Sequence, residues 1–139
     1  MSRIAVGIDG SKNSQAALEW AVDEARLRGA DLHIVTTWQL SGPAEGFGLG
    51  EYYEACREAS AILVAGAADW AAERLDTAVT HLSVNGAAVE TLSAQSVDSL
   101  MLVVGARGHG GFLGLVLGSV SSQIAHHATC AVVIVPYPG

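Results

Sequence analysis

The sequence predicts an α/β fold: a single doubly wound, five-stranded parallel sheet with helices on both faces. Short apolar runs rich in β-branched residues alternate strictly with longer segments of helical periodicity. The runs are apolar at almost every position, as expected of strands that are buried on both faces. With 139 residues, half of them apolar, the chain is expected to form one domain, residues 1–139, with its own core.

A short polar turn joins the first predicted strand to the first predicted helix. The apolar run at residues 4–8 ends at Asp9-Gly10-Ser11, and helical periodicity follows over residues 15–28. Gly29 is suited to end this helix, because glycine readily adopts the left-handed conformation. The expected inward face is formed by Leu18, Ala21, Val22 and Ala25, and the candidate N-caps are Ser11, Asn13 and Ser14.

The remaining elements continue the same alternation. A second strand is expected at residues 32–38, and a glycine-rich loop at 39–50 leads to an alanine-rich helix at 52–75. After these come a strand at 78–84, a helix at 89–95, a strand at 100–104, a helix at 120–128 and a last strand at 131–135.

Two of the predicted strands end in glycine-bearing segments. One is Asp9-Gly10-Ser11, and the other is the stretch 105–118 that precedes the fourth helix. Doubly wound sheets bind ligands where the carboxyl ends of their strands meet. Glycines allow close approach of the backbone, and the first turn of a helix presents unpaired N–H groups to an anion. If strands one and four are neighbours, these segments form one crevice suited to phosphate.

The spacing Gly105-x2-Gly108-x9-Gly118-Ser119 resembles the nucleotide-binding signature of the universal stress protein family. The segment Val6-x2-Asp9-Gly10-Ser11 and the closing segment 129–136 are similar to those of the same family. The resemblance therefore covers essentially the whole chain. One departure is Ala131, because family members usually carry proline after the cysteine.

The resemblance implies the strand order 3-2-1-4-5 and places the chain in the branch of the family that binds ATP or AMP, with Mg²⁺. It implies that Asp9 contacts the adenosine and that Gly7 and Thr37 line the base pocket. The residues implied to hold the phosphates and ribose are Gly105, Gly108, Gly118, Ser119, Val120 and Ser121.

Three functions are compatible with these residues. A nucleotide-binding regulatory module of the stress response, read by a protein partner that the sequence does not identify, fits best, because no Walker motif, paired carboxylates or nucleophile elbow is present. No catalytic residue is therefore predicted, and any ATP hydrolysis should be weak. The alternatives are an ATP-using enzyme of a related α/β fold, and a structural dimer that binds no nucleotide. The family usually forms homodimers, often through the last strand.

Composition narrows the range of partners and locations. The formal net charge is -7 and no basic run is present, which argues against nucleic acid and anionic membranes as partners. No signal peptide or membrane-length apolar run is visible, so a cytoplasmic location is expected. Cys56 and Cys130 lack metal or redox spacing and are expected to be buried thiols in a reducing compartment.

Several polar residues near the predicted crevice also have simpler interpretations. Asp9 is also suited to accept a hydrogen bond within a turn, although its position at the end of the first strand favours ligand contact. Ser119 and Ser121 are also suited to be ordinary helix caps, a role compatible with binding phosphate. Arg107 and His109 lie within the glycine-rich stretch, where they would either neutralise phosphate or remain solvated. No grouping of residues has the spacing of a metal site, and none is predicted.

Overall fold

The computed structural model describes residues 2–39, 49–107 and 119–137. These residues form strands and helices in strict alternation, as expected from the sequence. In chain order the elements are β1 (Arg3–Gly7), α1 (Lys12–Arg28), β2 (Asp31–Trp38), α2 (Leu49–Ala72), β3 (Val79–Asn85), α3 (Ala88–Gln95), the short 3-10 helix η1 (Ser96–Asp98), β4 (Met101–Gly105), α4 (Ser119–His127) and β5 (Ala131–Val135).

The five strands form one all-parallel sheet in the order β3-β2-β1-β4-β5. This arrangement confirms the predicted fold class and strand order. Val6 pairs with Ile34 of β2 on one side and with Val103 of β4 on the other. Successive strands are therefore added on one side of β1 up to β3 and on its other side from β4 onward. The neighbouring strands β1 and β4 carry the two glycine-bearing ends.

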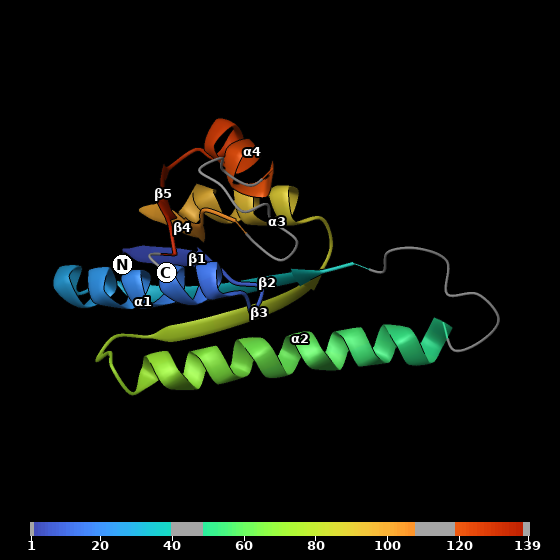
Figure 1. The fold of residues 1–139 in the computed structure, drawn as a ribbon. Helices are drawn as coiled ribbons and strands as arrows, with labels where there is room; N and C mark the ends of the chain where they lie inside the picture. The colour runs from blue at the N-terminus through green and yellow to red at the C-terminus, as the bar shows by residue number, and fades with distance from the viewer. Residues whose placement is uncertain (1, 40–48, 108–118, 138–139) are drawn as a thin grey trace.

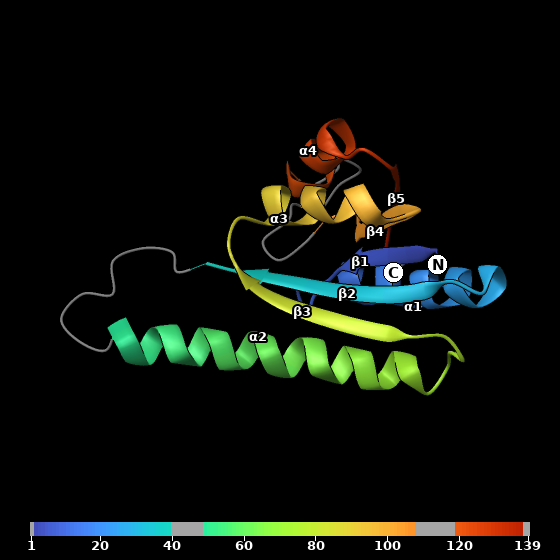
Figure 2. The same cartoon turned by 180° about the vertical axis from the view of Figure 1, so that it is seen from behind.

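Helices cover the sheet in two layers (Figures 1 and 2). Helices α1 and α2 enclose one core cluster, which includes Val6, Ile34 and Val103. Helices α3 and α4 lie on the other face, where Leu92 and Ile124 pack against Val35 and other strand residues. Side chains of a strand alternate between the two layers, so sequence parity decides which layer a strand residue contacts.

Most element boundaries differ from the predicted ones by a few residues. Helix α1 begins at Lys12 rather than residue 15, because Ser11 caps it. Helix α2 begins at Leu49 and ends at Ala72, so it takes in the last residues of the predicted loop at 39–50. Residues 40–48 of that loop lie outside the described part of the chain.

The predicted inward face of α1 is confirmed, because Leu18, Ala21, Val22 and Ala25 are all buried. The expectation of two buried cysteines is wrong. Cys56 and Cys130 are both free thiols of intermediate exposure. Cys56 lies in the part of α2 that is mostly exposed, and Cys130 directly precedes the edge strand β5, so neither position is enclosed on all sides.

Candidate functional site

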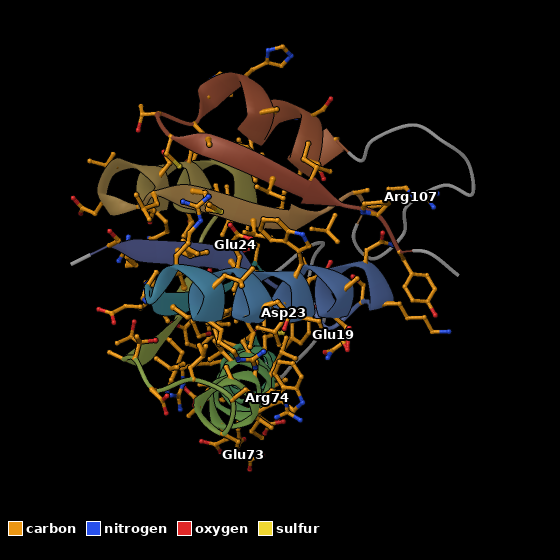
Figure 3. The ribbon with its side chains drawn as sticks, turned by 90° about the vertical axis from the view of Figure 1, so that its left-hand side faces the viewer. Glu19, Asp23, Glu24, Glu73, Arg74 and Arg107 are labelled. Carbon is orange, nitrogen blue, oxygen red and sulfur yellow. The ribbon has the colours of Figure 1, made fainter. Side chains whose placement is uncertain are left out.

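The carboxyl ends of β1 and β4 lie side by side, because the two strands are paired in parallel with Val6 opposite Val103. The predicted condition for a single crevice is therefore met. Beyond β1 the chain enters the turn that contains Asp9, and beyond β4 it continues through Ala106 and Arg107. Figure 3 shows Arg107 just past the end of β4.

The turn after β1 is closed by its own polar groups. The Asp9 carboxylate accepts a hydrogen bond from the Ser11 backbone N–H at 2.9 Å. The Ser14 hydroxyl accepts from the Asp9 N–H at 3.2 Å and donates to the Ser11 carbonyl at 3.0 Å. Gly10 has a φ of 85°, a left-handed conformation that favours glycine. The turn thus holds Asp9 at the sheet edge in a defined position.

Helix α1 starts from this turn. The Ser11 side chain accepts a hydrogen bond from the Ser14 N–H, so Ser11 is the N-cap among the three predicted candidates. Asn13 has a different role, since its side-chain oxygen accepts from the Tyr137 N–H at 3.1 Å. That hydrogen bond joins the first turn of α1 to the segment that follows β5.

Gly105 ends β4 directly against the first turn of α1. A Cβ added at this position would lie 2.8 Å from both the carbonyl carbon and the carbonyl oxygen of Asn13. Real Cβ atoms do not approach backbone that closely, so this glycine is required by packing. The first glycine of the motif therefore has a role in the fold, whatever its relation to a ligand.

Helix α4 begins at the same edge of the sheet. Ser119 and Val120 are exposed in its first turn, whereas Ser121 is buried. The Ser121 hydroxyl lies 2.7 Å from the Gly105 carbonyl oxygen and 3.0 Å from that of Ala106, so it donates to the end of β4. This bond fixes the first turn of α4, whose N–H groups have no partner within the helix, beside the β4 end.

The two residues implied to line the base pocket lie on the sheet face that α3 covers. Gly7 pairs with Val35, and Thr37 lies two residues further along β2 on the same face. Gly7 is buried, and a Cβ there would lie 2.9 Å from Leu92 of α3. Thr37 is half-buried, whereas its neighbour Thr36 is buried on the opposite face.

The structure thus brings together Gly7, Asp9, Gly105, Ser119, Val120 and Ser121, with Thr37 close to the same edge of the sheet. Gly108, His109 and Gly118 lie outside the described residues. Arg107 is half-buried. Within residues 2–39, 49–107 and 119–137, no group of three or more His, Cys, Asp or Glu side chains is placed to hold a metal ion.

Sequence reasoning missed the part that Asn13 plays at this edge. Asn13 has the residue type of an N-cap, and nothing in the local pattern shows that its backbone meets Gly105 or that its amide binds residue 137. Only the neighbouring arrangement of α1, β4 and β5 reveals both contacts.

Comparison with known proteins assigns the chain to a family. The sequence profile of the universal stress protein family matches residues 1–136. The chain belongs to this family. A universal stress protein of Mycobacterium tuberculosis is 34% identical over 131 residues, and one from Mycolicibacterium smegmatis is 35% identical over 133 residues. These matches cover 94% and 95% of this chain but only 44% and 45% of the relatives, so the chain spans about half their length.

Solved structures of the family share the fold along almost the whole chain. A universal stress protein from Lactobacillus plantarum superposes with a TM-score of 0.84 at 23% identity, covering 96% of this chain and 97% of that one. A universal stress protein solved in complex with cAMP is 30% identical, with a TM-score of 0.72 and 96% of each chain covered. One from Archaeoglobus fulgidus, solved in complex with dAMP, is 21% identical with a TM-score of 0.68, covering 97% and 98% of the two chains.

Proposed function

We propose that this protein is an adenine-nucleotide-binding regulatory module of the stress response. The observation that carries the proposal is the meeting of the Asp9 turn, the Gly105 strand end and the first turn of α4 at one edge of the sheet. Doubly wound sheets bind ligands at this kind of switch point. The 30% identical relative in complex with cAMP supports an adenine nucleotide as the ligand.

The described residues fit a phosphate-bearing ligand in two respects. The first turn of α4 presents backbone N–H groups at an exposed position, where the helix dipole favours an anion. The hydrogen bond from Ser121 to the end of β4 fixes that turn in place, so the turn itself needs little ordering on binding. We assign Ser119, Val120 and Ser121, with the motif glycines 105, 108 and 118, to the phosphates and ribose.

The opposite end of the ligand is assigned to the first two strands. We assign Asp9, which its own turn holds at the sheet edge, to the adenosine. Gly7, which lies against Leu92, and Thr37 share one sheet face, and we assign them to the base. ATP or AMP with Mg²⁺ is the proposed ligand, with the metal held chiefly by the phosphates.

A regulatory role follows if nucleotide binding changes what a protein partner recognises. A ligand biases such a switch only through its different affinities for two states of the protein. The sequence contains no Walker motif, paired carboxylates or nucleophile elbow, and the residues above are assigned to binding the phosphates, ribose and adenosine. We therefore propose binding, rather than turnover, as the primary activity.

The direct test is chemical identification of the ligand. The purified protein is denatured and released nucleotides are identified by chromatography, and the nucleotide-free protein is titrated with ATP, AMP and cAMP by calorimetry, with and without Mg²⁺. Release or saturable binding of an adenine nucleotide is expected. Absence of both would overturn the proposed function.

A matched pair of variants locates the ligand. Ser119→Pro removes both the hydroxyl and the backbone N–H at the first position of α4, where proline is tolerated, whereas Ser119→Ala removes only the hydroxyl. A lost hydrogen bond to a charged group is worth about 1.5–3 kcal/mol, so Ser119→Pro should weaken binding about tenfold or more. Ser119→Ala should have a smaller effect. Equal affinities for both variants and the parent would contradict the assignment of α4.

A further inference from the structure

Arg107 lies two residues beyond the end of β4, at the edge of the sheet to which the phosphates are assigned. Figure 3 shows it past the end of the strand, and its side chain is half-buried. The sequence leaves open whether this guanidinium neutralises phosphate or remains solvated. The contacts of its neighbours and of the other cations favour phosphate.

The backbone directly before Arg107 is held on both sides. The Ala106 N–H donates to the Val135 carbonyl oxygen at 2.9 Å, which continues the hydrogen bonds between β4 and β5. The Ala106 carbonyl oxygen accepts from the Ser121 hydroxyl at 3.0 Å. Consecutive Cα atoms are about 3.8 Å apart, so Arg107 follows within one residue of a contact with the first turn of α4. The fold therefore fixes where this side chain starts.

The other lysine and arginine side chains are already committed elsewhere. Their partners are carboxylates, backbone or hydroxyl oxygens, or a tyrosine ring, and the committed residues are Arg3, Lys12, Arg26, Arg28, Arg57 and Arg74. Of the cations in residues 2–39, 49–107 and 119–137, Arg107 alone has no hydrogen bond, ion pair or ring contact there. Its guanidinium is available to a ligand.

An anion is the partner that this position favours. Burying an unpaired charge is costly, so a half-buried guanidinium is stabilised by an anion beside it. The chain has 14 acidic and seven basic side chains, so the molecule as a whole repels a polyanion. A cation at the binding edge offsets this repulsion locally, and the planar fork of arginine matches the oxygens of a phosphate.

The strand order indicates which part of a nucleotide Arg107 meets. The base is assigned to β1 and β2, and the phosphates are assigned to the end of β4 and the start of α4. In the order β3-β2-β1-β4-β5, Arg107 lies beyond the phosphate end, where β4 pairs with β5. A nucleotide that extends from β2 toward β5 therefore brings its last phosphates to Arg107, whereas a monophosphate ends closer to β1.

From these observations, we propose that Arg107 binds the terminal phosphates and makes the site select ATP over AMP. This inference rests on the proposed function, because it requires a nucleotide at that edge of the sheet. Arg107 donates charge-assisted hydrogen bonds to oxygens that ATP has and AMP lacks. Selection therefore comes from the length of the phosphate chain, while the base and ribose are held by other residues.

The test is calorimetric titration of the nucleotide-free full chain with ATP and with AMP, each with Mg²⁺. Arg107→Gln removes the charge and the fork but keeps a long polar side chain. It should weaken ATP binding about tenfold or more and AMP binding less than about twofold. Arg107→Lys keeps the charge without the fork, so its affinity for ATP should lie between those of the parent and Arg107→Gln.

Arg57→Gln is the matched control. It removes the same charge from an exposed position on α2, where Arg57 pairs with Glu54, and should leave both affinities unchanged. Thermal unfolding confirms that each variant is folded. A second measurement needs no variant, because the Arg107 Nε–H signal of the parent in NMR spectra should shift with ATP and shift much less with AMP.

The outcomes separate this inference from the function on which it rests. A parent that binds neither nucleotide overturns the proposed function, and the role of Arg107 with it. The role of Arg107 alone is overturned if the parent binds ATP and AMP equally, if Arg107→Gln keeps the parent's ratio of the two affinities, or if ATP does not move the Nε–H signal.

Discussion

Gly105 and Gly7 are both buried at strand ends, but they face different neighbours. An added Cβ at Gly105 meets the backbone of Asn13 at 2.8 Å, whereas at Gly7 it meets the end of the Leu92 side chain at 2.9 Å. A side chain can rotate away, but backbone in a capped helix can move only with the helix. The resemblance assigned both glycines to the ligand, and the structure adds a packing role to each.

We therefore expect Gly105→Ala to destabilise the protein by about 1–3 kcal/mol, as other overpacking substitutions do. Gly7→Ala should cost less, because Leu92 can adjust. Urea unfolding of the parent and both variants provides the measurement. Gly50→Ala is the control, since a Cβ there meets nothing within 4 Å and α2 should gain helix propensity. Equal midpoints for the parent and Gly105→Ala would refute the packing role.

Ser121 illustrates how one residue can serve the fold and a site together. Its hydroxyl is committed to the carbonyl groups of Gly105 and Ala106, so it is a positioning group within the described structure. Its backbone N–H belongs to the first turn of α4 and remains suited to an anion. The hydroxyl of the family motif is that of Ser119, whereas the hydroxyl of Ser121 holds the first turn of α4 against the end of β4.

At the scale of elements, α1 depends on a single side-chain cap. The Ser11 side chain accepts a hydrogen bond from the Ser14 N–H at the start of the helix, and Gly29 ends the helix in the left-handed conformation. Ser11→Ala should lower the free energy of unfolding by about 1 kcal/mol, the usual effect of losing an N-cap. Ser11→Asp preserves an acceptor and should restore most of the loss. Chemical denaturation measures both, and an unchanged Ser11→Ala protein would contradict the cap.

His33, at the pairing of β2 with β3, is a group whose protonation depends on pH. His33 of β2 lies 2.6 Å from the Thr80 hydroxyl of β3. Burial chiefly, with Arg3 and His81, lowers the pKa of His33 below its usual 6.5. As pH falls below 6.5, the unfolded chain takes up a proton before the folded chain does, so the free energy of unfolding should decrease.

His33→Gln removes this titration while retaining a hydrogen-bonding side chain. Its free energy of unfolding should therefore fall less steeply than that of the parent as pH decreases from 6.5 through the pKa of the folded state. Well above that range His33 is neutral in both states, so the free energies of unfolding of the two proteins should change with pH in parallel. Denaturant unfolding over a pH series tests this, and identical slopes in the acidic range would exclude His33 as the cause.

At the scale of the whole molecule, the edge of the sheet formed by β5 is suited to contact a second copy of the chain. Among the described residues, strand β5 pairs only with β4, and its residues 132–135 are apolar and half-buried. An apolar edge strand risks uncontrolled pairing unless another surface covers it. We propose a homodimer through this edge, as the family resemblance suggests. Light scattering across a dilution series should show twice the chain mass at high concentration, and a strictly monomeric mass throughout would refute the dimer.

Among the described residues no helix has the length and apolar character needed to span a bilayer. The Mycobacterium tuberculosis and Mycolicibacterium smegmatis relatives are about twice as long as this chain, and they hold additional residues beyond the matched part. A partner for this chain and its cellular location therefore remain predictions from sequence.

The sequence by itself determined the alternation of elements, the parallel sheet and its family. These properties depend on periodicity, turn residues and motif spacing, which are encoded within short stretches such as residues 4–11 and 100–119. It also indicated the edge of the sheet where a ligand is expected, because strand order and connection handedness follow general rules.

Only the tertiary structure decided which residues meet across the chain. Gly105 lies against Asn13, Ser121 binds the end of β4, and the Asn13 side chain accepts a hydrogen bond from the Tyr137 N–H. Each contact joins elements far apart in sequence, so its geometry depends on how helices pack on the twisted sheet. No local pattern contains that information, because a glycine required by packing, such as Gly105, and a glycine beside open space, such as Gly66, look the same in one sequence.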